Sequence, residues 1–199
     1  GCDVQRGLGY CYHGDDFDQP TTTSPGYGEN PPAVGVDFFE GPYQDNDGVD
    51  NPLTSDIPTA LAMDGIPYSG LGIGYGDGTP DNERLGMKRF VYFSRGAAAA
   101  QSDPDDFTDY YNYMEGIWKD NEPFVYGGSG YPGSPGSTSI PTNYIFPGDS
   151  DPLYWGTGGV AGTIAGGWSE SNNGGTANNP NDRRWVQAAG PFILEPGAL

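Results

Sequence analysis

The chain is poor in the residues from which the commonest catalytic and metal sites are built. Among 199 residues it has two cysteines, one histidine and eight basic side chains. Because His13 is the single histidine, the chain has too few histidines for most histidine-based hydrolase sites, and a Ser-His-Asp triad would have to use His13. The cysteines are spaced C-x8-C, which matches no zinc motif. No apolar run approaches the roughly 18 residues of a membrane-spanning helix, so we expect no membrane insertion.

Positive charge is scarce as well, and acidic residues dominate. The chain has 27 acidic residues against 8 basic ones, which gives a net charge of −19. Such a surface repels nucleic acids and anionic membranes, so neither is expected as a partner. Repulsion among clustered carboxylates opposes folding unless divalent cations neutralise it. The charge therefore predicts calcium as a bound cofactor.

Glycine and proline are abundant, at 34 and 19 residues, which approaches the composition of low-complexity disorder. Aromatic residues nevertheless make up 14% of the chain and fall in clusters such as FVYF and DYYNYMEGIW, which is not typical of disordered segments. We therefore predict a mostly β fold: a sandwich-like, calcium-stabilised domain with long glycine- and proline-rich loops and one short helix. The aromatic side chains are expected to form its core rather than a sugar-stacking face.

The order of elements can be read coarsely from the residue pattern. Residues 1–33 are predicted to be a loop-rich N-terminal segment, and residues 34–199 a single β-rich domain. Strands are expected within 34–43, 87–95 and 183–194, because these stretches are rich in aromatic and β-branched residues. A helix is expected over 104–119, capped by Asp103, with one apolar face: Phe107, Tyr110, Tyr111, Met114 and Trp118. The chain stops part-way through what reads as a strand and turn, so we expect a piece of a longer protein.

The stretch QDNDGVDNP at 44–52 is the strongest candidate for a cation site. Asp45, Asp47 and Asp50 alternate around Gly48, and asparagines can add side-chain oxygens. Calcium takes six to eight oxygen ligands from flexible loops, and glycine allows the chain to turn tightly around the ion. The alternative is an Asx-rich turn whose carboxylates accept bonds from backbone N–H groups. We favour the cation.

Two more acidic turns support this interpretation. GDGTPDNERLG places three carboxylates within seven residues, and GDDFD adds another group near the cysteines. A third stretch, PGDSDP, offers only Asp149 and Asp151 and is a weaker signal. The predicted calcium ligands are Asp15, Asp18, Asp45, Asp47, Asp50, Asp77, Asp81 and Glu83.

Cys2 and Cys11 are predicted to form a disulfide. Two cysteines this close in an acidic chain rich in Tyr and Asn suggest folding outside the reducing cytosol. Closing so short a loop would contribute about 2–3 kcal/mol in the chain-entropy model. Two free thiols remain the alternative, since spacing alone does not establish pairing.

The few basic residues are expected in ion pairs rather than in a patch that binds anions. Arg84 and Arg183 each follow an acidic turn and precede a predicted strand. A guanidinium can bond a carboxylate through two N–H groups and is weakly hydrated. Both arginines are therefore predicted to pair with carboxylates and to be partly buried. Ordinary solvated arginines at the strand ends are the alternative.

Five sequence blocks follow one another between about residue 34 and the C-terminal end: DFFEGPYQDNDGVDNPL, GIGYGDGTPDNERLGMKRFVYF, YYNYMEGIWKD, FPGDSDP and DRRWVQAAGPFILEPGA. Together they resemble a region of large secreted Bacteroidota-type proteins of uncharacterised function that end in type IX secretion sorting domains. The resemblance implies export to the cell surface or the medium, and continuation of the chain as a further strand. It supplies no catalytic residues, and the first 33 residues match less well.

These observations predict a non-catalytic, calcium-stabilised part of a secreted or cell-surface protein with a structural, adhesion or assembly role. Its expected partners are the remainder of a larger parent chain or other surface proteins. The alternative is a carbohydrate-binding module or a glycosidase that uses a carboxylate pair, because such an enzyme needs only two acids about 5–10 Å apart. Acids in D-x-D turns suit that chemistry poorly, since a cation would keep them ionised.

Overall fold

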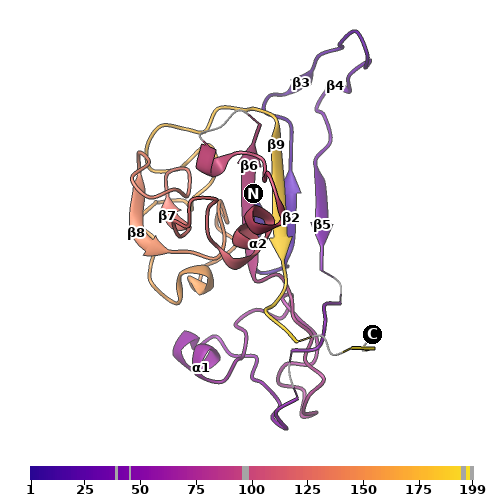
Figure 1. Ribbon diagram of the computed structural model, residues 1–199, viewed down its shortest axis with the longest axis vertical. Coiled ribbons are helices and arrows are strands. Elements are labelled where there is room, and N and C mark those ends of the chain that lie inside the picture. The colour runs from indigo at the N-terminus through magenta and orange to yellow at the C-terminus, as the bar shows by residue number, and fades with distance from the viewer. Residues whose placement is uncertain (39, 45, 96–98, 194–195, 198–199) are drawn as a thin grey trace.

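The computed structural model describes residues 1–38, 40–44, 46–95, 99–193 and 196–197. Helices account for 11% and strands for 23% of the structure, and the strands form several small antiparallel sheets. The predicted mostly β character is confirmed in this coarse form. Long segments rich in turns connect the elements (Figure 1).

All of the elements are short. The strands are β1 (Cys2–Asp3), β2 (Leu8–Cys11), β3 (Phe17–Asp18), β4 (Gly28–Glu29), β5 (Val34–Asp37), β6 (Arg89–Ser94), β7 (Val125–Gly127), β8 (Ser137–Pro141) and β9 (Arg183–Ala188). The helices are α1 (Ile57–Ala62) and α2 (Phe107–Glu115), with 3-10 helices η1 (Ala99–Gln101) and η2 (Trp155–Thr157). In the described part of the chain, no helix is both long enough and apolar enough to cross a membrane.

Strands β6 and β9 pair in the middle of the molecule, although they lie far apart in the sequence (Figure 1). They are antiparallel and in register from Arg89 opposite Ala188 to Ser94 opposite Arg183. β6 is buried from Phe90 to Ser94. A strand covered on both faces carries a continuous apolar run rather than an alternating one, which explains the sequence FVYF. Both strands were predicted from their composition, and both are confirmed.

Strands β1, β2 and β5 form a three-stranded sheet with β2 in its centre. This sheet packs against the β6–β9 pair, because a β-carbon on Gly9 would collide with side-chain atoms of Gln187, Phe90 and Trp185. The Gln187 side chain also donates a hydrogen bond to the Val36 carbonyl at 3.0 Å. Residues 1–33, expected to be loop-rich, thus supply two strands to the centre of the molecule.

Aromatic side chains form much of the core, as expected. We call one group the aromatic cluster: Val91, Tyr92, Phe93, Tyr113, Trp118, Phe124, Tyr126, Ile145, Phe146 and Trp168. Trp118 is fully buried, with its ring centroid 4.8 Å from that of Phe124 and 5.8 Å from that of Tyr113. The indole N–H groups of Trp118 and Trp168 donate to the carbonyls of Gly130 and Gly128, each at 3.0 Å. The rings therefore fill the core while their polar atoms are satisfied.

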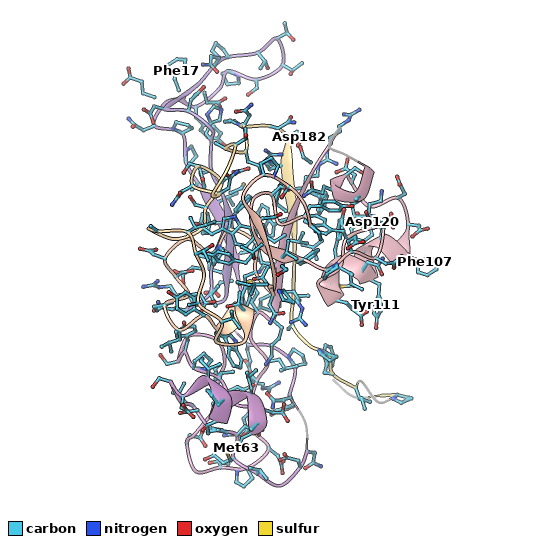
Figure 2. The ribbon with its side chains drawn as sticks, turned by 90° about the vertical axis from the view of Figure 1, so that its left-hand side faces the viewer. Phe17, Met63, Phe107, Tyr111, Asp120 and Asp182 are labelled. Carbon is cyan, nitrogen blue, oxygen red and sulfur yellow. The ribbon has the colours of Figure 1, made fainter. Side chains whose placement is uncertain are left out.

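Helix α2 is shorter than predicted, and the sequence interpretation of its apolar face was wrong. Asp106, not Asp103, caps it: its side chain accepts bonds from the N–H groups of Thr108 and Asp109. The helix ends at Gly116, which has a φ of 87°. The helix buries Asn112 and Tyr113. Trp118 follows the turn at Gly116 and so leaves the helix face on which it was placed. Four residues of that predicted face are exposed to solvent instead: Phe107, Tyr110, Tyr111 and Met114. Figure 2 shows Phe107 and Tyr111 on the outside of the molecule.

The hairpin of β3 and β4 and the helix α1 lie at opposite ends of the molecule (Figure 1). Asp56 caps α1 by accepting a bond from the Thr59 N–H group, and Pro58 occupies its first turn. The chain between β5 and β6 contains α1 and both of the long acidic turns. The position of α1 therefore marks the region in which most of the predicted cation ligands lie.

Backbone segments approach each other closely at two glycines in this region. A β-carbon on Gly86 would overlap the carbonyl oxygen of Leu71, and one on Gly41 would overlap that of Leu85. Only a residue without a side chain permits such an approach. At these positions, the high glycine content of the chain serves close packing of the backbone rather than disorder.

Candidate cation site and aromatic pocket

Two of the acidic turns, residues 44–52 and 74–84, lie against each other, and we call this region the acidic junction. The Asp50 carboxylate accepts hydrogen bonds from the N–H groups of Gly76 and Gly78 at 2.8 and 2.7 Å. In the other direction, Asp81 accepts a bond from the Gly48 N–H group at 2.8 Å. Each turn thus binds the other through hydrogen bonds to ionised oxygens, which are stronger than bonds between neutral groups.

Asp47 and Asp77 shape their own turns. Each accepts a bond at 2.8 Å from the N–H group two residues further along, that of Val49 or Thr79. Bonds from the Asn82 amide and the Thr79 N–H group lower the pKa of the Asp77 carboxyl from its ordinary 3.8. These contacts are the Asx turns that stood as the alternative to a cation in the sequence.

The structure brings some of the predicted ligands together and separates others. Asp45 lies outside the described residues. Asp15 and Asp18 lie in and beside the β3–β4 hairpin, at the far end from α1, where both flank His13 at 3.2 and 3.4 Å. Across the described residues, no group of three or more His, Cys, Asp or Glu side chains is arranged to hold a metal ion. The predicted ligand set, as far as it is described, therefore forms no cluster of acids.

Glu83 differs from the other acids of the junction because it is buried, with 1% of its surface exposed. Its Oε1 accepts a bond from the Asn51 N–H group at 2.6 Å, whereas its Oε2 has no hydrogen-bond partner. The adjacent Arg84 does not neutralise it. That guanidinium pairs with Glu40 at 3.1 Å and lies 3.4 Å from the Tyr43 ring centroid. Glu83 is therefore a buried acidic side chain with no described basic partner and with one oxygen that accepts no hydrogen bond.

Two amide oxygens share this property. Asn51 Oδ1 and Asn82 Oδ1 are buried and lack hydrogen-bond partners, and Asn51 as a whole is 1% exposed. The amide nitrogens on the same side chains do have partners. Asn51 donates to the Met63 carbonyl at 3.1 Å, and Asn82 donates to Asp77 at 3.0 Å. In the described junction, every buried side-chain atom left without a partner is thus an oxygen acceptor.

The predicted Cys2–Cys11 disulfide is not present in the structure, where both cysteines are free. The register of β1 and β2 places Gly9, not Cys11, opposite Cys2. Cys11 lies two residues further along and so occupies a diagonal position, where separations are typically about 7 Å. A disulfide needs β-carbons about 4 Å apart. Burial raises the pKa of the Cys2 thiol, whose sulfur lies 3.7 Å from the Ile145 carbonyl oxygen.

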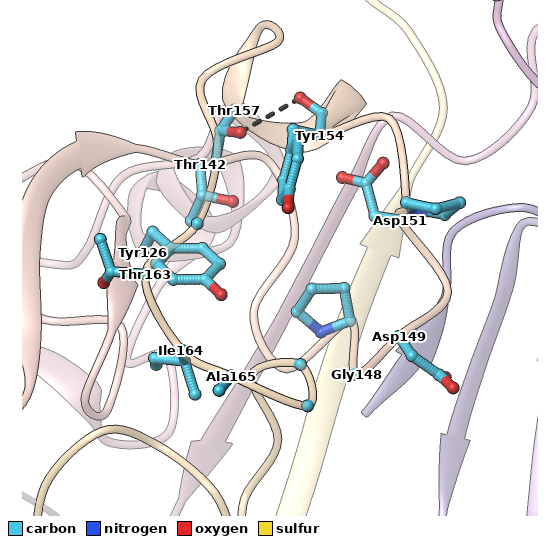
Figure 3. Close-up of a pocket in the computed structure, with 15 residues that line it drawn as sticks. Tyr126, Thr142, Gly148, Asp149, Asp151, Tyr154, Thr157, Thr163, Ile164 and Ala165 are labelled. Carbon is cyan, nitrogen blue, oxygen red and sulfur yellow. Dashed lines mark hydrogen bonds between the residues drawn. The ribbon is translucent and has the colours of Figure 1, made fainter.

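A pocket of about 550 Å³ opens beside β7 and η2 (Figure 3). The rings of Tyr126 and Tyr154 border it, together with Thr163, Ile164 and several glycines. The nearby Asp151 carboxylate is occupied by structural bonds from Tyr68, Trp155 and Gly156, each at 2.8 Å. The pocket therefore combines aromatic rings, hydroxyl groups and exposed backbone.

Tyr154 adopts a left-handed backbone conformation, with φ 58° and ψ 36°. This conformation is rare for a bulky residue and costs about 1–3 kcal/mol. Hydrogen bonds from the N–H and hydroxyl groups of Thr157 to the Tyr154 carbonyl, each 3.1 Å, help to maintain it (Figure 3). The strained turn leaves the side chain 38% exposed at the edge of the pocket.

Sequence reasoning missed this pocket, because Tyr126 and Tyr154 lie far apart in the chain and no motif connects them. Comparisons with known proteins found no matching family model, no similar curated protein and no similar solved structure. A functional proposal for this chain therefore depends on the geometry of its own residues.

Proposed function

We propose that this chain is a non-catalytic, calcium-stabilised part of a secreted or cell-surface protein, with a structural, adhesion or assembly role. One observation carries the proposal. The acidic junction holds Asp47, Asp50, Asp77, Asp81 and Glu83, yet none of these makes an ion pair with a described basic residue. In a chain of net charge −19, a divalent cation is the natural counter-charge for this region. Calcium at extracellular concentration would supply it.

The contacts of the acids support a non-catalytic role. A general acid must be free to reach its substrate, whereas the carboxylates of Asp50 and Asp81 are engaged by backbone N–H groups of the opposite turn. The pKa of Asp77 is lowered rather than raised. Among the described residues, His13 contacts Asp15 and Asp18 at the hairpin and lies far from the junction. The available chemistry therefore suits binding of a cation better than proton transfer.

The sequence resemblance to secreted Bacteroidota-type proteins with type IX sorting domains is retained as part of this proposal. Two of its five blocks, at 37–53 and 72–93, contain the two turns that meet in the acidic junction. A shared cation site would explain why both blocks occur together. The packing of β2 against β6 and β9 supports the sandwich-like domain that we propose around them.

Thermal unfolding in chelator and in millimolar calcium tests the proposal. An ion that binds only the folded state stabilises it by about 2.7 kcal/mol at 100 times its dissociation constant. We expect chelation to lower the melting temperature and calcium to restore it. Potassium chloride at matched ionic strength is the control, since it screens charge without coordinating. Coincident melting curves in chelator and in calcium would contradict the proposal.

A second candidate function, binding of a glycan, is favoured by the pocket in Figure 3. Strained residues often occur at ligand sites, and Tyr154 presents its ring there at a conformational cost. Aromatic faces with nearby hydroxyl groups suit the apolar and polar faces of a sugar ring. A glycan array with calcium present tests this candidate. Tyr154→Ala should abolish any signal, whereas Tyr27→Ala, at a tyrosine 75% exposed on the distant hairpin, should preserve it.

A further inference from the structure

We propose that a calcium ion is coordinated in the acidic junction by Glu83 Oε2, Asn51 Oδ1 and Asn82 Oδ1. This inference rests on the proposed function and deepens it, because it names the atoms that bind the ion. It also changes the expected ligand set. Asp47, Asp50, Asp77 and Asp81 build and join the turns through their bonds to N–H groups, whereas one buried carboxylate and two amides bind the ion.

The backbone brings Asn51 into contact with Glu83 and places Asn82 next to Glu83 in the chain. The Asn51 N–H group bonds the Glu83 carboxylate directly, at 2.6 Å. Asn82 precedes Glu83 in the chain, and its Oδ1 lies against Gly74, where an added β-carbon would collide with it. The Asn51 carbonyl accepts a bond from Gly76 at 2.9 Å, which ties the first turn to the same loop. Both sides of the site are thus fixed by hydrogen bonds that do not use the three oxygens.

The chemistry of the unpartnered atoms distinguishes a cation from a proton or a water molecule. All three atoms are acceptors, and the amide nitrogens beside them already have acceptors of their own. A proton on Glu83 would neutralise its charge and supply one O–H donor, which could satisfy one amide oxygen but would leave the other unsatisfied. A single water molecule can donate two hydrogen bonds, one fewer than the three acceptors require. A calcium ion takes six to eight oxygen ligands, so it can bind all three atoms and also neutralise the carboxylate.

Calcium fits this donor set better than magnesium. All three atoms are hard oxygen ligands, and the loop between them is rich in glycine, which suits the variable geometry of calcium. Magnesium requires near-ideal octahedral geometry and gives up its water reluctantly. A site with one carboxylate and two amides carries little formal charge. We therefore expect an affinity in the range of extracellular modules, with a dissociation constant of about 10⁻⁴–10⁻³ M.

Calorimetric titration with calcium chloride, together with thermal unfolding, tests the site in the wild-type chain and two variants. Glu83→Gln keeps the size of the side chain but removes its charge, and it places an amide where two unpartnered oxygens could accept from it. We expect calcium to bind this variant at least about tenfold more weakly. In chelator it should melt at or above the wild-type temperature, because an uncompensated buried charge is gone. Glu122→Gln, which removes the same charge from an exposed position, should bind calcium as the wild type does.

The outcomes separate this inference from the proposed function. Calcium stabilisation of the wild type that persists in Glu83→Gln would overturn the site assignment and leave the proposed function standing. Absence of any calcium effect on the wild type would overturn both. If Glu83→Gln does not fold, Asn82→Asp takes its place. An added carboxylate should lower the melting temperature in chelator and enlarge the upward shift on adding calcium. A shift smaller than that of the wild type would overturn the assignment.

Discussion

The aromatic cluster and the acidic junction differ in whether their buried polar atoms have hydrogen-bond partners within the protein. In the aromatic cluster, the indole N–H groups of Trp118 and Trp168 each find a carbonyl acceptor within the protein. In the acidic junction, three buried oxygens find no donor among the described residues. One region satisfies its polar atoms internally, whereas we propose that the other takes a cation from solution. Conditions that change the solution should therefore act on the two regions differently.

The largest expected effect comes from the centre of the aromatic cluster. Trp118→Ala should destabilise the protein by about 3–5 kcal/mol, because it removes a fully buried indole and leaves a cavity. The loss should be the same in chelator and in calcium, since no acid of the junction contacts this ring. Urea unfolding in both solutions measures it. A loss that depended on calcium by more than about 1 kcal/mol would show that the two regions are coupled.

The two predicted arginine pairs are confirmed, and they differ between the regions. Arg183 bonds Glu170 at 2.8 Å beside Tyr92 of the aromatic cluster, and both partners are partly buried. Arg183→Ala should cost about 1.5–3 kcal/mol, because a half-buried carboxylate loses a charged hydrogen bond. Arg84→Ala should cost less than about 1 kcal/mol, since the Glu40 side chain is 61% exposed. Chemical denaturation of both variants tests the order, and equal losses would contradict it.

Alkaline pH should weaken the molecule through buried tyrosine. Burial raises the pKa of Tyr144, which donates a 2.8 Å bond to the Met87 carbonyl, above its ordinary 10.0. Its contribution is complete below pH 10 and is lost as the pH rises, because the unfolded chain ionises first. At about pH 11 the loss should be about 1.4 kcal/mol. Denaturation midpoints between pH 9 and 11 measure it. Tyr144→Phe should reduce the dependence by this amount without removing it, because burial also raises the pKa of Tyr68 and Tyr113.

The smallest effect is expected on the outer face of α2. Phe107 is 84% exposed, so Phe107→Ser should change the unfolding free energy by less than about 0.5 kcal/mol. Tyr113, fully buried in the same helix, is the matched position. Tyr113→Ala should cost about 3–5 kcal/mol. Similar losses for the two variants would mean that Phe107 is covered in solution.

The sequence predicted the elements that local composition determines. β6 and β9 were found because their aromatic and β-branched residues favour strands, and α2 because its apolar residues recur at helical spacing. β8 was missed, since a Ser- and Thr-rich segment resembles a loop. The buried face of α2 was assigned wrongly in two ways. Trp118 lies beyond Gly116, where the helix ends, and the four predicted residues within the helix face solvent, whereas Asn112 and Tyr113 are buried. A pattern along the chain does not show where a left-handed turn interrupts it.

The acidic turns were also recognisable from the sequence, but their pairing was not. Acids clustered around glycine identify each turn separately, whereas the bonds that the Gly76 and Gly48 N–H groups donate to Asp50 and Asp81 join segments distant in the chain. Glu83 differs from the other acids of the junction in being buried, and its burial could not be read from the sequence. The diagonal offset of the two cysteines depends in the same way on strand register, which their spacing does not encode.

The close backbone contacts at Gly41 and Gly86 have a consequence for how this sequence can change over time. Neither glycine contributes apolar area, yet a single methyl group at either position would push two backbone segments apart. A saturation mutagenesis scan should therefore find these two positions as intolerant as the buried tryptophans. The outer face of α2, although aromatic, should accept many substitutions. In this chain, tolerance to substitution should depend more on the space around the backbone than on the hydrophobicity of the residue.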